Sequence, residues 1–369
     1  MSSSTVTWEL SLRILFVIRY TSEIKRNYTS FVPFRHCSNE TSHRRSYNSE
    51  LWHTKLLTSP KKIPIMADQA DQADQFKQGH TVPVTKQSFP GKEHDMPNEP
   101  EPQRTYLPGE EGQKIPYLAA GKLKGKNAVI TGGDSGIGRA TAILFAEEGA
   151  DSLIAYLPDE EKDAQDTKKA VEAHGRKCHL FSADLSKQEN CKKLADQAIK
   201  TFDGKIDILF NNAAYQMMVE DIKDLPEEQW VHTFNINIHS FFYISKYLLP
   251  YMKYGSTIIN NASINAYIGR PDLLDYTSTK GAIISFTRGL SNQYVSKGIR
   301  VNAVAPGPVW TPLIPATMND EAQKQFTSPI GRPGQPSEIA ACVVFLASAD
   351  SSCVAGQTIH CNGGVIVNG

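Results

Sequence analysis

The chain has 369 residues, 40% of them hydrophobic and 21% charged, and its 39 basic side chains are balanced by 39 acidic ones. This composition is that of a globular protein, and the lack of a basic excess argues against a dedicated nucleic-acid-binding protein. No apolar run approaches the roughly 20 residues of a membrane-spanning helix. The six cysteines form no C-x-x-C pair or zinc-like spacing, so we expect no metal site and a reducing compartment.

Residues 1–65 differ from the remainder in charge. They hold ten Lys/Arg and four Asp/Glu, whereas 66–369 hold 29 and 35. We expect this segment to be disordered, and two interpretations stay open. It is either a basic targeting sequence of the mitochondrial kind or an extension absent from the native protein, because Met66 begins a polar stretch typical of a natural N-terminus. The first interpretation predicts a mitochondrial location and the second a cytoplasmic one.

Residues 66–120 predict an extended arm. They are rich in Gln, Glu and Pro, show little apolar periodicity, and contain seven prolines between Pro83 and Pro116. Proline breaks helices, and so polar a segment buries too little apolar surface to fold by itself. We expect an arm without a core of its own, which lies along the body or reaches a neighbouring subunit.

From residue 121 onward, short apolar runs alternate with helical patterns. Strands are expected at 127–131, 152–156, 178–182, 206–210, 256–260, 300–304 and about 357–360, and helices at 137–148, 160–174, 187–202, 227–252, 276–296 and 337–348. This alternation predicts an α/β fold with a doubly wound, mostly parallel sheet, formed by one domain over 121–369. Such sheets bind ligands beyond the carboxyl ends of their strands.

A glycine-rich turn, Thr131-Gly-Gly-Asp-Ser-Gly-Ile-Gly138, joins the first strand to the first helix. Glycine allows close backbone approach, and the first N–H groups of the helix favour a pyrophosphate. The placement of the turn therefore predicts dinucleotide binding on a Rossmann fold. The turn residues expected at the cofactor are Thr131, Gly132, Asp134, Ser135, Gly136, Ile137 and Gly138.

The spacing Thr-Gly-x-x-x-Gly-x-Gly resembles that of the short-chain dehydrogenase/reductase family, and further motifs follow in the family's order. Asn211-Asn-Ala-Ala214 follows the fourth strand, with alanine last where many members have glycine. Ser263 follows the fifth strand, Tyr276-Thr-Ser-Thr-Lys280 comes 13 residues later, and Pro306-Gly307 follows the sixth strand. The resemblance covers about 121–369.

The arm and the stretch that begins Tyr156-Leu-Pro-Asp-Glu-Glu are similar to one subgroup of that family. This subgroup contains glucose/ribitol dehydrogenase homologues and NADPH-dependent aldehyde reductases. The resemblance implies an oxidoreductase that transfers a hydride between NADP(H) and a small aldehyde, ketone or polyol. The alternative is a catalytically weak regulatory or scaffold protein that binds the cofactor on the same fold.

The resemblance implies a catalytic set of Asn237, Ser263, Tyr276 and Lys280. Tyr276 and Lys280 lie four residues apart and share one helix face. A free tyrosine has a pKa near 10, and a nearby ammonium or oxidised nicotinamide should lower it, so that Tyr276 serves as general acid in reduction and as base in oxidation. In the family, the serine holds the substrate oxygen, the lysine the nicotinamide ribose, and the asparagine supports a water linked to the lysine.

The cofactor type is inferred from the end of the second strand. NAD enzymes usually place a carboxylate there for the ribose hydroxyls, but the position holds Tyr156, and no carboxylate follows until Asp159. No arginine is present there for a 2′-phosphate either, so NADP(H) is favoured and NAD(H) is the alternative. Asp184 could accept a hydrogen bond from the adenine amino group, and Thr311 could reach the nicotinamide carboxamide. The further expected contacts are Leu185, Asn211, Ala213, Tyr276, Lys280, Pro306, Gly307 and Val309.

The substrate wall is expected from 264–275, Met217–Met218 and 310–330. The last stretch is either a mobile lid or an ordinary surface loop. Members of the family usually form homotetramers, so we expect the apolar tail Gly363–Val367 to be buried at a subunit interface. We expect neither nucleic acid nor a membrane span among the partners.

Overall fold

The computed structural model describes residues 73–97, 105–365 and 367. The expectations for 1–65, that the segment is disordered and either targets the protein or is absent from it, lie outside the described residues. No helix in the described part of the chain has the length and apolar character needed to cross a membrane.

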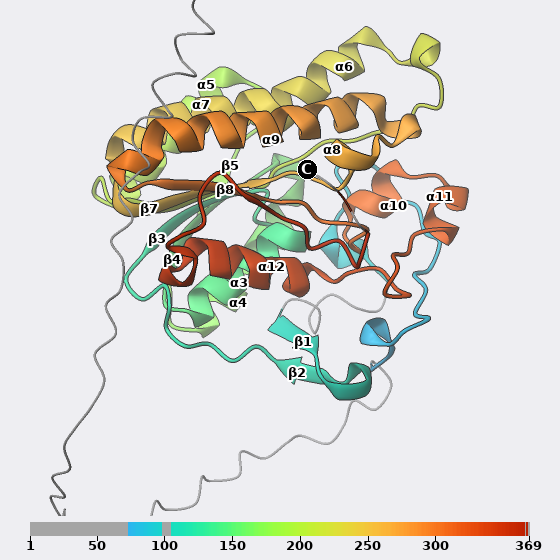
Figure 1. The fold of residues 1–369 in the computed structure, drawn as a ribbon, viewed down its shortest axis with the longest axis horizontal. Helices are drawn as coiled ribbons and strands as arrows, with labels where there is room; N and C mark the ends of the chain where they lie inside the picture. The colour runs from blue at the N-terminus through green and yellow to red at the C-terminus, as the bar shows by residue number, and fades with distance from the viewer. Residues whose placement is uncertain (1–72, 98–104, 366, 368–369) are drawn as a thin grey trace, which may run out of the picture. The chain divides into compact units, whose positions relative to one another are not determined.

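A seven-stranded parallel sheet organises the body, in the order β5-β4-β3-β6-β7-β8-β9 (Figure 1). The chain moves outward from β3 to β5 and then returns to β6 on the other side of β3, which creates a switch point beside β3. The predicted doubly wound sheet is confirmed. The strands are β3 (Asn127–Thr131), β4 (Asp151–Tyr156), β5 (Cys178–Ser182), β6 (Ile206–Asn211), β7 (Met252–Asn261), β8 (Arg300–Val304) and β9 (Thr358–Ile359).

Helices cover both faces of this sheet. The α-helices are α3 (Gly136–Glu147), α4 (Glu161–Ala173), α5 (Gln188–Thr201), α6 (Glu227–Phe234), α7 (Ser240–Leu248), α8 (Asn265–Ile268), α9 (Leu274–Tyr294), α10 (Leu313–Thr317), α11 (Asp320–Lys324) and α12 (Pro336–Ala347). Figure 1 shows α3, α4 and α12 on one face and α5, α7 and α9 on the other. Because both faces are covered, the central strands are continuous apolar runs, and all six residues of β6 are buried.

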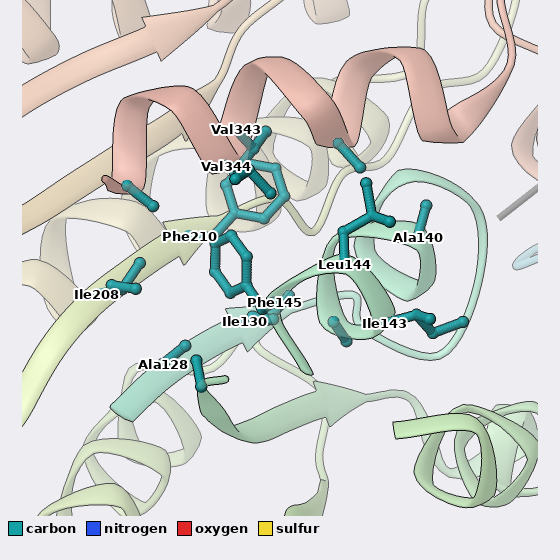
Figure 2. Close-up of a cluster of buried hydrophobic side chains, with 14 of the residues drawn as sticks. Ala128, Ile130, Ala140, Ile143, Leu144, Phe145, Ile208, Phe210, Val343 and Val344 are labelled. Carbon is teal, nitrogen blue, oxygen red and sulfur yellow. The ribbon is translucent and has the colours of Figure 1, made fainter. Parts of the chain in front are cut away.

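The core beneath α3 and α12 packs α3 against the sheet. Figure 2 shows Phe145 of α3 and Phe210 of β6 between the strands and α12, with Val344 of α12 close to Phe210. Both phenylalanines are fully buried. Burial of a large side chain contributes roughly 1.5–3 kcal/mol. This packing therefore holds α3, the helix that follows the glycine-rich turn, against the strands.

The helix predicted over 227–252 is not one regular α-helix. A π-helical segment, η7 (Asn235–His239), separates α6 from α7, and a 3-10 turn, η8 (Leu249–Tyr251), ends the run. Strand β7 starts at Met252, four residues before the predicted strand. A π-helical turn carries one extra residue and often occurs at functional sites. Here it lies around Asn237, whose side chain is completely buried.

The described parts of the arm form short local structure and pack along the body. The pair β1 (Tyr106–Pro108) and β2 (Lys114–Pro116) is antiparallel, and the 3-10 turns are η2 (Ala73–Phe76), η3 (Glu93–Asp95) and η4 (Glu110–Gly112). Val82 and Met96 are buried in a cluster that contains Tyr276 and Trp310 of the body. The arm thus shares the apolar core of the body.

Candidate active site

A cavity of about 380 Å³ opens beyond the carboxyl ends of the parallel strands. Its wall comes from the turn after β3, the ends of β4 and β5, the loops after β6, β7 and β8, and helix α9. The sequence-predicted residues on the wall are Gly132, Asp134, Ser135, Gly136, Ile137, Tyr156, Asp184, Leu185, Ala213, Ser263, Tyr276, Lys280, Pro306, Gly307, Val309 and Thr311. The switch point of the sheet is therefore also where the predicted residues meet.

The glycine turn presents backbone to this cavity. Gly132 and Gly136 have φ values of 60° and 49°, which favour glycine, and a Cβ at Gly138 would lie 1.8 Å from the Gly132 oxygen. Thr131 and Gly138 do not line the cavity and instead shape the turn. The Thr131 Oγ1 atom accepts the N–H groups of Asn212 and Ala213 at 2.8 and 2.9 Å.

The turn fits a dinucleotide. Neighbouring protein atoms exclude side chains at Gly132, Gly136 and Gly138, and α3 begins directly behind the turn, so its first N–H groups are favourable for a phosphate. The Asp134 Oδ2 atom, in a residue of the cavity wall, is buried without a hydrogen-bond partner among the described residues. Such an acceptor suits a hydroxyl or amino donor of a bound ligand.

The Ser263, Tyr276 and Lys280 side chains meet on one side of the cavity. Lys280 Nζ donates to the Asn261 carbonyl at 2.7 Å and lies 5.1 Å from the centre of the Tyr276 ring. The Tyr276 hydroxyl is hydrogen-bonded to Ser263. Both Tyr276 and Lys280 are buried, on successive turns of α9. The arrangement places a proton donor, a hydrogen-bonding hydroxyl and an amine around one point of the wall.

Burial sets the protonation of this group. It raises the pKa of Tyr276 to about 12, although the hydrogen bond with Ser263 opposes the shift. It lowers the pKa of Lys280 to about 7. The expected lowering of the tyrosine pKa by the lysine is therefore not found in the protein alone, because desolvation of both groups outweighs their attraction. Tyr276 is protonated at neutral pH, in the form that a general acid requires.

Asn237 and Asn211 lie away from the cavity wall. Asn237 Oδ1 accepts the Tyr215 N–H at 2.7 Å, and its Nδ2 donates to the Tyr215 carbonyl and to Thr279 Oγ1 at 2.9 and 3.0 Å. It thereby ties the loop after β6 to α9 next to Lys280. Asn211 Nδ2 donates to Asn260 Oδ1 at 2.9 Å inside the sheet.

The placement of Asn211 corrects the predicted cofactor contact. Side chains alternate along a strand, so only one of two neighbouring asparagines can face the ligand side. The residue on the cavity wall is Asn212, and Asn211 is completely buried.

A buried carboxyl that the sequence argument missed lies on the wall near the end of β4. Glu160 follows the strand by four residues, and its Oε2 accepts the Leu157 N–H at 3.1 Å. Burial, with the charge of Asp134 next, raises the pKa of Glu160 to about 9, and burial raises that of Asp134 to about 6. The signal was present in Leu-Pro-Asp-Glu, whose Glu160 caps the turn that starts at Leu157.

The substrate wall also differs in part from the prediction. Residues of 264–275 and 310–330 line the cavity, but Met217 and Met218 do not, and Gln216 does. The Gln216 side chain donates to Thr317 Oγ1 of α10 at 2.9 Å, so it points toward the wall while the next two residues turn away.

The C-terminal tail also contacts its own chain. The Ile330 N–H donates to the Gly363 carbonyl at 3.0 Å, and Val365 lines the cavity. Burial of this tail in a homotetramer stays a prediction.

Comparison with known proteins gives consistent matches. A family model described as enoyl-(acyl carrier protein) reductase matches residues 132–366. The chain is 49% identical over 298 residues to the glucose and ribitol dehydrogenase of Daucus carota, covering 79% of this chain and 99% of the relative. It is 47% identical over 287 residues to the NADPH-dependent aldehyde reductase 1, chloroplastic, of Arabidopsis thaliana, covering 76% and 96%.

A solved structure shares the fold. A short-chain dehydrogenase from Burkholderia cenocepacia in complex with NADP matches with a TM-score of 0.62 and 29% identity, over 66% of this chain and 98% of that chain. The match covers nearly the whole of that protein and leaves about a third of this chain outside it.

Proposed function

The chain belongs to the short-chain dehydrogenase/reductase family, and we propose that it is an NADP(H)-dependent oxidoreductase that reduces small aldehydes or ketones, or oxidises the corresponding alcohols or polyols. The observation that carries this proposal is the meeting of Ser263, Tyr276 and Lys280 on the wall of the cavity that the glycine turn forms. A protein that only bound the cofactor would have no chemical need for this buried arrangement.

The side chains of the site support a general-acid mechanism. When bound, the reduced nicotinamide supplies the hydride. The Ser263 hydroxyl is placed to hold the substrate oxygen, and Tyr276, protonated at neutral pH, donates its Oη proton to that oxygen. Lys280, held by the Asn261 carbonyl, places a partly charged amine beside the tyrosine ring and favours the phenolate left behind. In alcohol oxidation the same tyrosine would act as base.

Three observations support NADP(H) as the cofactor. Tyr156 ends β4 where an NAD enzyme usually has a carboxylate. One relative is named as NADPH-dependent, and one similar solved structure is a complex with NADP. Glu160 on the wall does not exclude a phosphate at neutral pH, because its pKa of about 9 leaves it uncharged. NAD(H) remains the alternative.

The test is a steady-state assay of the full chain with NADPH and with NADH against a panel of small aldehydes, ketones and polyols. We expect NADPH oxidation with at least one aldehyde, and a higher kcat/KM with NADPH than with NADH. Tight NADPH binding without turnover on the whole panel would reject the reductase and favour a regulatory or scaffold protein. A strong preference for NADH would reject the cofactor assignment.

A further inference from the structure

The arm contacts both the glycine turn and the segment 311–326, two parts of the wall that are far apart in sequence. We propose that Glu93 of the arm is a positioning residue of the dinucleotide site, and that the arm segment 85–96, the strap, holds the glycine turn and the segment 311–326 in their binding arrangement. This inference rests on the proposed function only in that the ligand is a dinucleotide.

Glu93 caps the helix that begins the dinucleotide site. Its Oε2 accepts the N–H of Gly136, the first residue of α3, at 2.9 Å. The first N–H groups of a helix have no acceptor within the helix, and Ser135, at the N-cap position, makes no side-chain cap here. A carboxylate at a helix N-terminus is also favourable electrostatically. A residue 43 positions earlier therefore supplies the cap.

A buried network fixes Glu93 and returns to the turn. The Glu93 N–H donates to Asp163 Oδ2 at 2.8 Å, and the His94 N–H donates to Asp163 Oδ1 at 3.1 Å. Arg139 Nη2 donates to the Asp163 carbonyl at 2.8 Å, and Arg139 Nε donates to the Asp134 carbonyl at 2.8 Å. The strap thus holds the Gly136 N–H directly, and the Asp134 carbonyl through α4 and α3.

The strap also holds the segment 311–326. The Thr85 N–H donates to the Gln323 side chain at 3.1 Å, and that side chain returns a bond to the Thr85 carbonyl at 2.9 Å. The Gln87 N–H donates to the Pro315 carbonyl at 3.1 Å. Figure 1 shows the blue arm beside α10 and α11.

Gly91 fits against the same segment so closely that a Cβ would lie 2.3 Å from the Pro312 oxygen. This approach leaves no room for a side chain, so the close packing of the strap against the segment requires glycine at position 91. Glu93, with its contact to Gly136, follows only two residues later along the strap.

The strap forms part of the wall, whereas Glu93 stands behind it. Phe89 and Pro90 line the cavity, and the Phe89 ring meets Tyr215 edge-on at 4.8 Å between centroids. Glu93 is completely buried and is not among the lining residues. Its carboxylate therefore supports the turn from outside instead of occupying the place of a ligand phosphate. Support of this kind raises affinity because the turn is ordered before the ligand arrives.

Side-chain length and charge can be separated at this position. Glu93→Gln keeps the length and an acceptor oxygen but removes the charge, whereas Glu93→Asp keeps the charge but shortens the reach by one methylene. The control is Glu110→Gln, which removes an exposed acid from the same arm. Each variant is made in the full chain.

Two measurements read the outcome: the NADPH dissociation constant from a fluorescence titration, and amide hydrogen exchange over 132–139 without cofactor. We expect Glu93→Asp to weaken NADPH binding about tenfold and to speed exchange in the turn, since one buried N–H loses its acceptor. Glu93→Gln should stay within about threefold of the parent, because a neutral acceptor retains most of the bond. Glu110→Gln should match the parent in both.

Three results would overturn the proposal. One is unchanged or tighter NADPH binding in Glu93→Asp; another is exchange in the turn that does not change. The third is a larger loss in Glu93→Gln than in Glu93→Asp, which would assign the effect to charge. Hydrogen exchange needs no cofactor and no turnover. A parent protein that binds NADPH but reduces no substrate would reject the proposed function and leave this test readable.

Discussion

Replacing Lys280 by methionine should stabilise the protein while removing its activity. The fall in the pKa of Lys280 from 10.5 to about 7 corresponds to about 5 kcal/mol of unfavourable charge burial below pH 7. Methionine has a similar volume and no charge, but it leaves the Asn261 carbonyl without its donor, a loss of about 1–3 kcal/mol. We therefore expect Lys280→Met to raise the free energy of unfolding by about 2–4 kcal/mol at pH 6.

The gain in the free energy of unfolding of Lys280→Met should decrease as the pH rises. Because the pKa of Lys280 is lower in the folded protein, the unfolded chain binds more protons between about pH 7 and pH 10.5, and parent stability rises with pH across that window. The advantage of Lys280→Met should be largest below pH 7 and shrink toward pH 10. Urea unfolding of the parent, Lys280→Met and the exposed control Lys253→Met at pH 6, 8 and 10 measures it. A pH-independent difference, or a less stable variant at pH 6, would refute the reasoning.

Three further predictions concern the site. Tyr276→Phe should cut turnover roughly 10²–10⁴-fold by removing the general acid, with NADPH affinity kept within about twofold in a fluorescence titration; retained turnover would remove Tyr276 from that role. Thr131→Ala should weaken NADPH binding about tenfold because two N–H groups lose their shared acceptor. Thr131→Ser keeps the hydroxyl and should bind NADPH like the parent. Equal losses in both variants would show that the methyl group matters instead. In the parent, NADPH affinity should fall above about pH 9, where Glu160 ionises. In Glu160→Gln, NADPH affinity should stay constant from pH 8 to 10. The same fall in that variant would exclude Glu160 as the cause.

The sheet could be predicted because its central strands are buried on both faces and are therefore apolar runs of distinctive length. Ser263, Tyr276 and Lys280 could be identified because their spacing is preserved within local motifs. The π-helical segment around Asn237 could not, since nothing in the local pattern separates it from a regular helix. The direction in which the pKa of Tyr276 shifts could not be predicted either, because it depends on burial by other elements and not on any local motif.

The arm shows the same limit more clearly. Its polar composition predicts that it has no core of its own, but a segment of this kind carries no periodic pattern to show what it contacts. Glu93 looks like a solvated acid in the sequence, and only tertiary packing brings it to α3. Glu160 was not expected at the cavity because it lies four residues beyond β4, in the 3-10 turn Pro158–Glu160, and only the fold brings that turn to the cavity wall.

The charges of the cavity explain why the position of its backbone matters so much. Among the described lining residues the basic side chains are Arg270 and Lys280. Arg270 is bound by both oxygens of Asp272 at 2.6 and 2.9 Å, and Lys280 is only partly charged near pH 7. An anionic dinucleotide must therefore be held mainly by backbone N–H groups and the N-terminus of α3. Such donors bind well only when their directions are fixed, which is the role that Thr131 has from within the sheet and that we assign to Glu93 from the arm.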